Sequence, residues 1–86
     1  MDDYRVDFAR SARKELEALS DSIAMRVLRR VETLAATPRP NGCRKLAGSD
    51  NLWRIRIGDY RVIYSIDDKQ GVVDVNGVRH RKDAYE

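Results

Sequence analysis

The sequence predicts an α+β fold with a short N-terminal strand, an antiparallel helical hairpin and then an antiparallel sheet, in the order β-α-α-β-β-β. Two patterns predict it. Apolar residues recur at helical spacing from about residue 9 to residue 35, whereas from residue 51 onward apolar and polar residues alternate with the period of a strand. Helices that precede a run of strands cover one face of the sheet and leave the other open. Because the chain has 86 residues, we expect one domain over residues 1–86 with a single core.

The first part of the chain predicts one strand and two helices. Residues 4–8 alternate apolar and charged side chains, as in a short strand, and residues 9–19 have the apolar stripe of an amphipathic helix. The polar segment 20–22 interrupts this pattern and offers side chains that cap the free N–H groups of a second helix. That helix ends near Thr37, because Pro38 disfavours helical geometry in the residue before it. So short a connection predicts an antiparallel pair of helices.

Residues 51–65 are the most informative stretch and predict a hairpin of two strands joined by a turn at Gly58-Asp59. Glycine accepts the positive φ that such a turn needs. Because side chains alternate between the two faces of a strand, this turn decides which residues share a face. The face toward the core carries Trp53, Ile55, Ile57, Tyr60, Val62 and Tyr64. The opposite, open face carries Arg54, Arg56 and Arg61.

The remaining segments predict a loop, a turn and a last strand. Residues 38–50 contain two prolines and two glycines, so we expect an irregular loop there. After a polar turn at residues 67–71, residues 72–78 form a further strand, in which Asn76-Gly77 predicts a bulge or kink. That kink leaves the face of Arg79 open.

Composition narrows the class of protein. The net charge is +3 at pH 7 and the sequence pI is near 9.3, which is a mild excess of positive charge. Cys43 is the only cysteine, so we expect no internal disulfide and no metal cluster. We also expect no cofactor. No apolar run is long enough for a signal peptide or a membrane span, so we expect a soluble, cytoplasmic protein that has no membrane partner.

The open face of the hairpin carries an unfavourable pair of charges. With the predicted turn, Arg56 lies opposite Arg61. Two arginines whose β-carbons lie about 5 Å apart on a sheet repel by about 1 kcal/mol in water and about 3 kcal/mol at an intermediate dielectric. Two interpretations stay open at this point: a solvated face on which the arginines splay apart, and a site for a polyanion.

Two motifs and the order of the elements resemble one protein family. The motifs are Leu-Trp-Arg-Ile-Arg-Ile-Gly-Asp-Tyr-Arg-Val-Ile-Tyr at 52–64 and Arg-His-Arg-Lys-Asp-Ala-Tyr at 79–85, with Leu-Ala-Gly at 46–48 in the preceding loop. Together they resemble the RelE/ParE superfamily of toxins from bacterial toxin–antitoxin pairs, over almost the whole chain. The resemblance implies a RelE-like fold and, for the RNA-cleaving branch, a metal-free endoribonuclease that cuts mRNA in the ribosomal A site.

The resemblance also implies a set of site residues. The family's basic pair on the first hairpin strand, its second-strand arginine, its later arginine and its C-terminal tyrosine fall on Arg54, Arg56, Arg61, Arg79 and Tyr85, with Arg81 competing for the place of Arg79. The best-known members have lysines at the first pair, which are arginines here. Arginine is a poor base, since its pKa lies above about 12. Proton transfer is therefore left to Tyr85 or His80.

Three functions remain open, and each carries its own partners. The first is a RelE-like, ribosome-dependent endoribonuclease, whose partners are the ribosome and mRNA. The second is a ParE-like toxin that poisons DNA gyrase without cutting RNA, and the third is a catalytically degenerate protein that only binds its antitoxin. In every case the resemblance implies a RelB-like antitoxin as partner, and we expect the toxin–antitoxin complex to bind operator DNA through the antitoxin. The basic residues and the tyrosine, retained here as a set, favour the first function.

Overall fold

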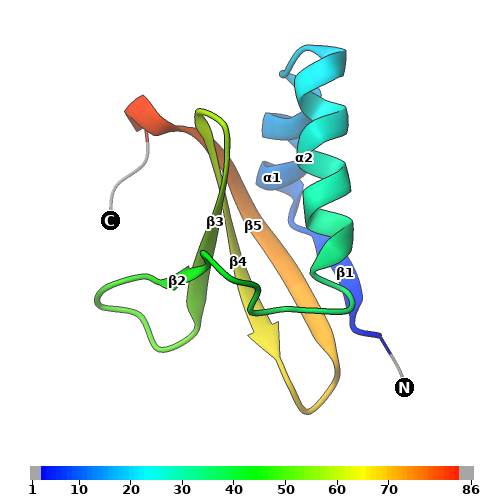
Figure 1. The fold of residues 1–86 in the computed structure, drawn as a ribbon, viewed down its shortest axis with the longest axis vertical. Helices are drawn as coiled ribbons and strands as arrows, with labels where there is room; N and C mark the ends of the chain where they lie inside the picture. The colour runs from blue at the N-terminus through cyan, green and yellow to red at the C-terminus, as the bar shows by residue number, and fades with distance from the viewer. Residues whose placement is uncertain (1–2, 84–86) are drawn as a thin grey trace.

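The protein folds as two helices against one sheet (Figure 1). The structure is a computed structural model and describes residues 3–83. Its elements are β1 (Arg5–Phe8), α1 (Arg10–Glu17), α2 (Asp21–Thr33), β2 (Arg44–Lys45), β3 (Leu52–Ile57), β4 (Tyr60–Asp67), β5 (Val72–His80) and a short 3-10 helix, η1 (Arg81–Asp83). The predicted α+β class and the order of the predicted elements are confirmed. The segment predicted as loop adds the short strand β2.

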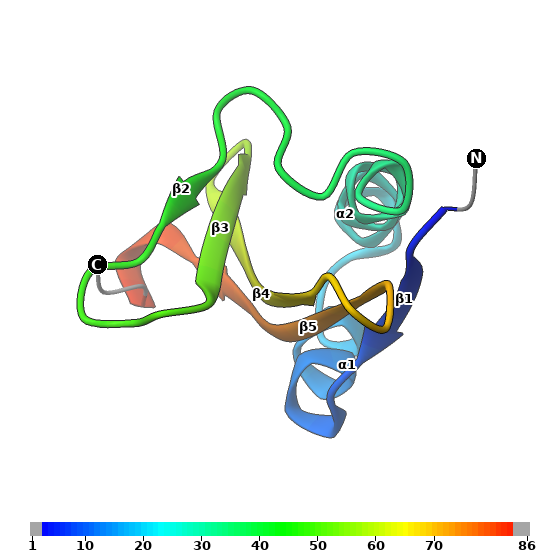
Figure 2. The ribbon, with the colours of Figure 1, turned by 90° about the horizontal axis from the view of Figure 1, so that it is seen from below.

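The sheet has the strand order β1-β5-β4-β3-β2. Neighbours pair antiparallel except β1 and β5, which pair parallel, so the sheet is mixed. A parallel neighbour needs a long connection, and the two helices together with the hairpin supply it. Figure 2 shows β1 at one edge of the sheet and β2 at the other, with the sheet strongly curved between them.

The hairpin has the predicted turn and register. Gly58 has a φ of 59°, whereas Asp59 has no positive φ, as in a type II′ turn. Ile57 lies opposite Tyr60, and Arg56 lies opposite Arg61. The prediction of the turn therefore placed the side chains of both strands on the correct faces.

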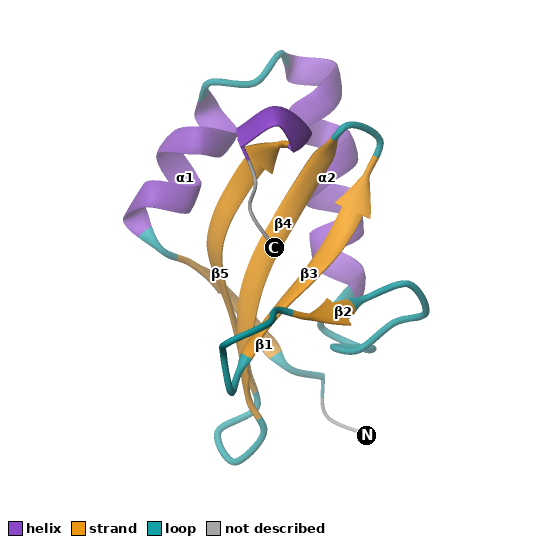
Figure 3. Cartoon of the chain, turned by 90° about the vertical axis from the view of Figure 1, so that its left-hand side faces the viewer, coloured by secondary structure: helices purple, strands orange, loops and turns teal. Residues whose placement is uncertain are grey.

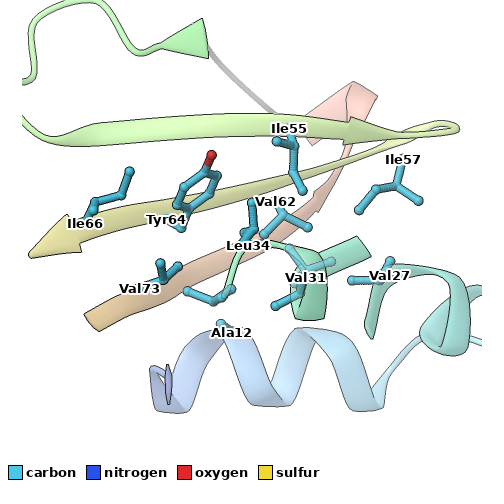
Figure 4. Packing of buried hydrophobic residues seen from close by; sticks show 12 residues of the cluster. Ala12, Val27, Val31, Leu34, Ile55, Ile57, Val62, Tyr64, Ile66 and Val73 are labelled. Carbon is cyan, nitrogen blue, oxygen red and sulfur yellow. The ribbon is translucent and has the colours of Figure 1, made fainter. Parts of the chain in front are cut away.

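The core lies between the helices and one face of the sheet (Figure 4). Its buried residues come from α1, from the region of α2, and from β3, β4 and β5: Ala12, Val27, Val31, Leu34, Ile55, Ile57, Val62, Tyr64, Ile66, Val73, Val75 and Val78. Trp53 and Tyr60, which share that face, are partly buried at its margin. The predicted core face of the hairpin is thus confirmed.

The two helices are antiparallel and shorter than predicted (Figure 3). Ser20, in the predicted polar segment, is the N-cap of α2, with a φ of −62° and a ψ of 156°, but its side chain makes no capping hydrogen bond, so the predicted side-chain cap is not found there. The helix ends at Thr33, whose hydroxyl donates to the Arg30 carbonyl at 2.6 Å. The chain then turns before Pro38 instead of remaining helical up to it. Of the helices in residues 3–83, none has the length and apolar character needed to cross a bilayer.

The predicted bulge lies in β5 and settles where Arg79 points. Ile63 pairs with Gly77 and Tyr64 pairs with Val75, so Asn76 has no partner of its own across the pair of strands. The Ser11 hydroxyl of α1 donates to the Asn76 carbonyl at 3.3 Å. Beyond the bulge, Arg79 lies opposite Arg61 and therefore on the same face of the sheet.

Candidate active site

Four arginines share the face of the sheet opposite α2, and we call this face the arginine face. Arg56 on β3 lies opposite Arg61 on β4, which lies opposite Arg79 on β5. These three form the arginine row, in which neighbouring strands are about 4.8 Å apart. Arg54 lies two residues before Arg56 and has the same orientation. In Figure 3, α2 lies behind the sheet, and η1 lies in front of the upper ends of β4 and β5.

The arginine face is not uniformly open, and this corrects the expectation from the sequence. Arg54 is only 6% exposed, Arg61 is half-buried and Arg56 is exposed. The short strand β2 explains part of the difference, because Arg44 pairs with Arg54 on one side and Ile63 lies opposite it on the other. Arg56 lies beyond the end of β2 and therefore remains accessible.

Glu15 on α1 holds the outer member of the arginine row. Its Oε2 lies 2.7 Å from Nε of Arg79, and its Oε1 accepts a hydrogen bond from the Val78 N–H at 2.9 Å. The pairing of β1 with β5 ends at Val75, so Val78 lies where the edge of β5 has no neighbouring strand. Glu15 therefore accepts a hydrogen bond from a backbone N–H at this strand edge, and it partly neutralises the positive charge of Arg79. Sequence reasoning missed it, because Glu15 sits in a run of charged helix-surface residues.

His80 lies on the other face of the sheet. It pairs with Tyr60, and the two rings meet edge-on with centroids 5.2 Å apart and planes at 89°. Its Nδ1 accepts the Lys82 N–H at 3.2 Å. The structure therefore does not bring His80 together with the arginine row. Tyr85 lies outside the described residues.

Arg81 returns to the arginine row at the tip of the hairpin. Its N–H donates to the Asp59 carbonyl at 2.7 Å, and its Nε lies 3.9 Å from Asp59 Oδ1. A small hollow of about 80 Å³ forms between this segment and the hairpin tip, with the lining residues Arg56, Gly58, Asp59, Tyr60, Arg61 and Arg81. Arg81 thus extends the row over the turn, while Arg79 extends it within the sheet.

A larger hollow opens at the other side of Arg56, between α2, β2 and β3. It has a volume of about 490 Å³, and we call it the basic hollow; its lining residues are Arg30, Gly42, Arg44, Arg54 and Arg56. Sequence reasoning did not connect Arg30 or Arg44 with the arginine face, because they come from elements that the periodicity does not place side by side. The only sign of this site in the sequence is that positively charged residues cluster near Arg30 and Arg44.

The loop that borders the basic hollow is anchored to the core. Tyr64 is fully buried, and its hydroxyl donates to the Pro38 carbonyl at 2.7 Å. Burial raises the pKa of the Tyr64 phenol, so this hydroxyl keeps its proton and remains a donor. The guanidinium of Arg39 lies 5.0 Å from the centroid of the Trp53 ring, which fixes the next residue of the loop by a cation–π contact.

Asp68, in the turn between β4 and β5, ties the same loop to the N-terminal strand region. It accepts two hydrogen bonds from Arg39, at 3.0 and 3.3 Å, and one from the Tyr4 hydroxyl at 2.6 Å. The hydrogen bonds from Arg39 and then from Tyr4 lower the pKa of the Asp68 carboxyl. The same contact with Asp68 raises the pKa of Tyr4. Three segments distant in sequence are therefore held at one carboxylate.

The described part of the chain has no cluster of metal-ligating side chains. Within residues 3–83, no three side chains of His, Cys, Asp or Glu gather in an arrangement that would hold a metal ion. The chemistry that this part of the chain offers is that of guanidinium groups. Such groups bind phosphate oxygens through paired hydrogen bonds.

Comparison with known proteins decides the family. The family model described as "ParE toxin of type II toxin-antitoxin system, parDE" matches residues 6–85. The chain belongs to the RelE/ParE superfamily of toxins. The resemblance stated from the sequence motifs is confirmed. The matched residues include β2 to β5 and all of β1 except Arg5, and therefore the whole arginine face of this RelE/ParE toxin.

Relatives of this RelE/ParE toxin are similar over almost their full lengths. RelE1 of Methanocaldococcus jannaschii, a toxin by its name, is 28% identical over 85 residues, covering 95% of this chain and 94% of the relative. A chain of the RelE–RelB complex from Pyrococcus horikoshii is 34% identical with a TM-score of 0.81, covering 94% of this chain and 98% of that chain. The isolated E. coli RelE toxin is 26% identical with a TM-score of 0.79, covering 90% and 83% of the two chains.

Proposed function

We propose that this RelE/ParE toxin is a RelE-like mRNA interferase, a metal-free endoribonuclease that cuts mRNA in the ribosomal A site and so inhibits translation. The observation that carries the proposal is the arginine row, with Arg56, Arg61 and Arg79 opposite one another on three adjacent strands. A row of guanidinium groups is costly to a fold that gains nothing from it, because like charges repel across a sheet. The similarity to proteins named RelE adds support.

The chemistry of RNA cleavage explains why arginines suit this position. A 2′-hydroxyl loses its proton and attacks the adjacent phosphorus, the bond to the 5′-oxygen breaks, and the leaving oxygen takes up a proton. Between these steps the non-bridging oxygens on phosphorus carry extra negative charge. Guanidinium groups bind phosphate oxygens bidentately and stabilise that charge, and loss of one such donor costs on the order of a hundred- to a thousandfold in rate. We assign this role to Arg56 and Arg61, with Arg54, Arg79 and Arg81 holding the flanking charge.

Proton transfer is assigned to Tyr85 rather than to His80. The arginines stay protonated at any working pH and cannot serve as the base. The ring of His80 packs against Tyr60 on the opposite face of the sheet, which argues against its contact with a phosphate on the arginine row. Tyr85 lies outside the described residues, and its role rests on the resemblance of the C-terminal motif.

We further propose that the toxin is held inactive by a RelB-like antitoxin. Several solved neighbours are complexes of RelE with RelB, among them the Pyrococcus horikoshii complex and the E. coli RelBE complex. An antitoxin segment with acidic residues would cover the arginine face by charge complementarity. We expect the complex to bind operator DNA through the antitoxin.

A second function is favoured by one specific finding, the name of the matching family model. That model is described as a ParE toxin, and ParE-like proteins are expected to poison DNA gyrase without cutting RNA. A degenerate protein that only binds the antitoxin is the third case, because arginines replace the lysines of the best-known members at Arg54 and Arg56.

One experiment separates the three functions. The protein is added to a cell-free translation system, message ends are mapped by primer extension, and gyrase supercoiling is assayed in parallel. The proposed function predicts new 5′ ends within codons, on translated messages only, with normal supercoiling. Intact messages with inhibited supercoiling would establish the ParE-like function. Intact messages with normal supercoiling would leave a protein that only binds its antitoxin.

A further inference from the structure

The basic hollow is a cluster of positive charge drawn from three elements. Arg30 comes from α2, Arg44 from β2, and Arg54 and Arg56 from β3, while Gly42 closes the hollow with backbone alone. Gly42 has a φ of 91°, and a Cβ at this position would meet nothing within 4 Å. The loop therefore presents its backbone to the hollow without a side chain in the way.

Three of the four arginines that line this hollow have no carboxylate partner in the described part of the chain. Among residues 3–83, no carboxylate lies within 4 Å of the guanidinium groups of Arg30, Arg44 or Arg56. Arg79, by contrast, is paired with Glu15, and Arg39 is paired with Asp68. Arg30, Arg44 and Arg56 therefore keep guanidinium donors for a ligand in the hollow, whose volume of about 490 Å³ is large enough for a phosphate group.

The wall of the hollow is held in place before any ligand arrives. The loop that contains Gly42 is fixed at its start by the Tyr64 hydroxyl and by Arg39, which contacts both Asp68 and Trp53. The other end of this loop is fixed by β2, which pairs with β3. Preorganisation of this kind lowers the entropy that binding must overcome.

We propose that the basic hollow is a phosphate-binding subsite for single-stranded RNA, holding a phosphodiester next to the one that the arginine row contacts. The proposal rests on the proposed function. Arg56 lines both the basic hollow and the small hollow at the hairpin tip, so one strand of RNA can pass from one to the other. Arg30 and Arg44 are then the residues that set how many nucleotides the toxin engages.

RNA fits the hollow better than an acidic protein segment. The guanidinium groups of Arg30, Arg44 and Arg56 around one space match the several oxygens of a phosphodiester and its neighbour, because each guanidinium offers a planar fork of donors. The hollow also continues into the arginine row, as a repeating backbone of phosphates requires. An acidic peptide as the occupant is one outcome of the test below.

The test is a binding titration that needs no cleavage. The purified toxin is titrated by calorimetry with a short 2′-O-methyl RNA, which lacks the attacking hydroxyl, at several salt concentrations. The hollow variant is a double variant that carries both Arg30→Gln and Arg44→Gln. The matched control is a double variant that carries both Arg29→Gln and Lys45→Gln. The matched pair removes the same charge from neighbouring positions that do not line the hollow. Thermal melting checks that both variants fold.

The expected result is a loss of affinity of about tenfold or more for the hollow variant, with a decrease of about one in the slope of log affinity against log salt. The matched variant should bind within about twofold of the parent protein. Equal losses in the two variants would overturn the proposal, since binding would then follow net charge alone. Tight binding of a glutamate-rich peptide that needs Arg30 and Arg44, with RNA binding unchanged, would assign the hollow to a protein partner instead.

The same variants separate failure of this subsite from failure of the proposed function. If RNA binding depends on Arg30 and Arg44 but the protein leaves translated messages intact, the proposed nuclease function is refuted and the proposed subsite is supported. If the protein cleaves translated messages but its RNA binding does not depend on Arg30 and Arg44, the proposed nuclease function is supported and the proposed subsite is refuted.

Discussion

At the scale of single residues, the site depends on how each arginine is supported. Arg79 is held by Glu15 through a contact of 2.7 Å, and the same carboxylate accepts the Val78 N–H. One side chain of α1 therefore performs two tasks, completing the edge of β5 and aiming a guanidinium along the arginine face. Among residues 3–83, no carboxylate pairs with Arg56. Its guanidinium can therefore move to bind a ligand.

The dual role of Glu15 gives a testable separation of structure from function. Glu15→Gln keeps an acceptor for the Val78 N–H but loses the charge next to Arg79, whereas Glu15→Ala loses both. We expect Glu15→Ala to lower the free energy of unfolding by about 1–2 kcal/mol and Glu15→Gln to lower it by less. Both should reduce message cleavage, because Arg79 loses its orientation. Urea unfolding and primer extension measure the two effects, and unchanged cleavage in both variants would exclude a positioning role.

At the scale of elements, the predictable features are those with a local cause. The alternation in β3 and β4 and the Gly58-Asp59 turn predict the opposition of Arg56 and Arg61, because a two-residue turn sets the register. The bulge at Asn76-Gly77 was also visible locally. The strand β2 was not, since two residues carry no periodicity, and the burial of Arg54 that depends partly on it was missed for the same reason.

The ion pair that holds the loop between α2 and β2 should make the stability of the protein depend on pH. Asp68 has a folded pKa below its ordinary value, near 3.8, because Arg39 and Tyr4 donate hydrogen bonds to its charged form. A depressed carboxyl pKa contributes stability above the unfolded pKa, and this contribution is lost as the pH falls through the folded pKa. We expect Asp68→Asn to be less stable than the parent protein at pH 7, with the difference shrinking as the pH falls below about 4 and disappearing only below the folded pKa of Asp68.

Thermal melting of both proteins from pH 7 to pH 2 measures this difference. Lys69→Asn, at the next position in the same turn, is the matched control. A stability difference for Asp68→Asn that stays constant across this range would show that the carboxylate charge does not hold the loop.

At the scale of the whole molecule, two layers divide the tasks. The helices and the inner face of the sheet supply the core, so the outer face is free to carry charge that folding does not need. The class of fold and the family could be predicted from the sequence, because periodicity and two motifs extend along the whole chain. The contact of Glu15 with β5 and the meeting of Arg30 with Arg44 could not, because each joins segments whose proximity depends on the complete fold.

The arrangement of the whole molecule also predicts dependence on the ribosome. The arginine face offers charge stabilisation, whereas the only histidine lies on the other face. Cleavage of free RNA should therefore be slow, and the ribosome must orient the message or assist proton transfer. We expect little cleavage of a purified message in the absence of ribosomes. Equal rates of cleavage with and without ribosomes would contradict this dependence.

The measurement that tests the central claim most directly is the rate of message cleavage on programmed ribosomes by the protein and by Arg61→Ala. Arg61 lies at the centre of the arginine row, and Lys69→Ala is the control, because it removes a positive charge beyond the opposite end of β4. We expect cleavage by Arg61→Ala to be about a hundred- to a thousandfold slower, and cleavage by Lys69→Ala to be unchanged. Cleavage by folded Arg61→Ala at the rate of the parent protein would contradict the assignment of the arginine row as the active site.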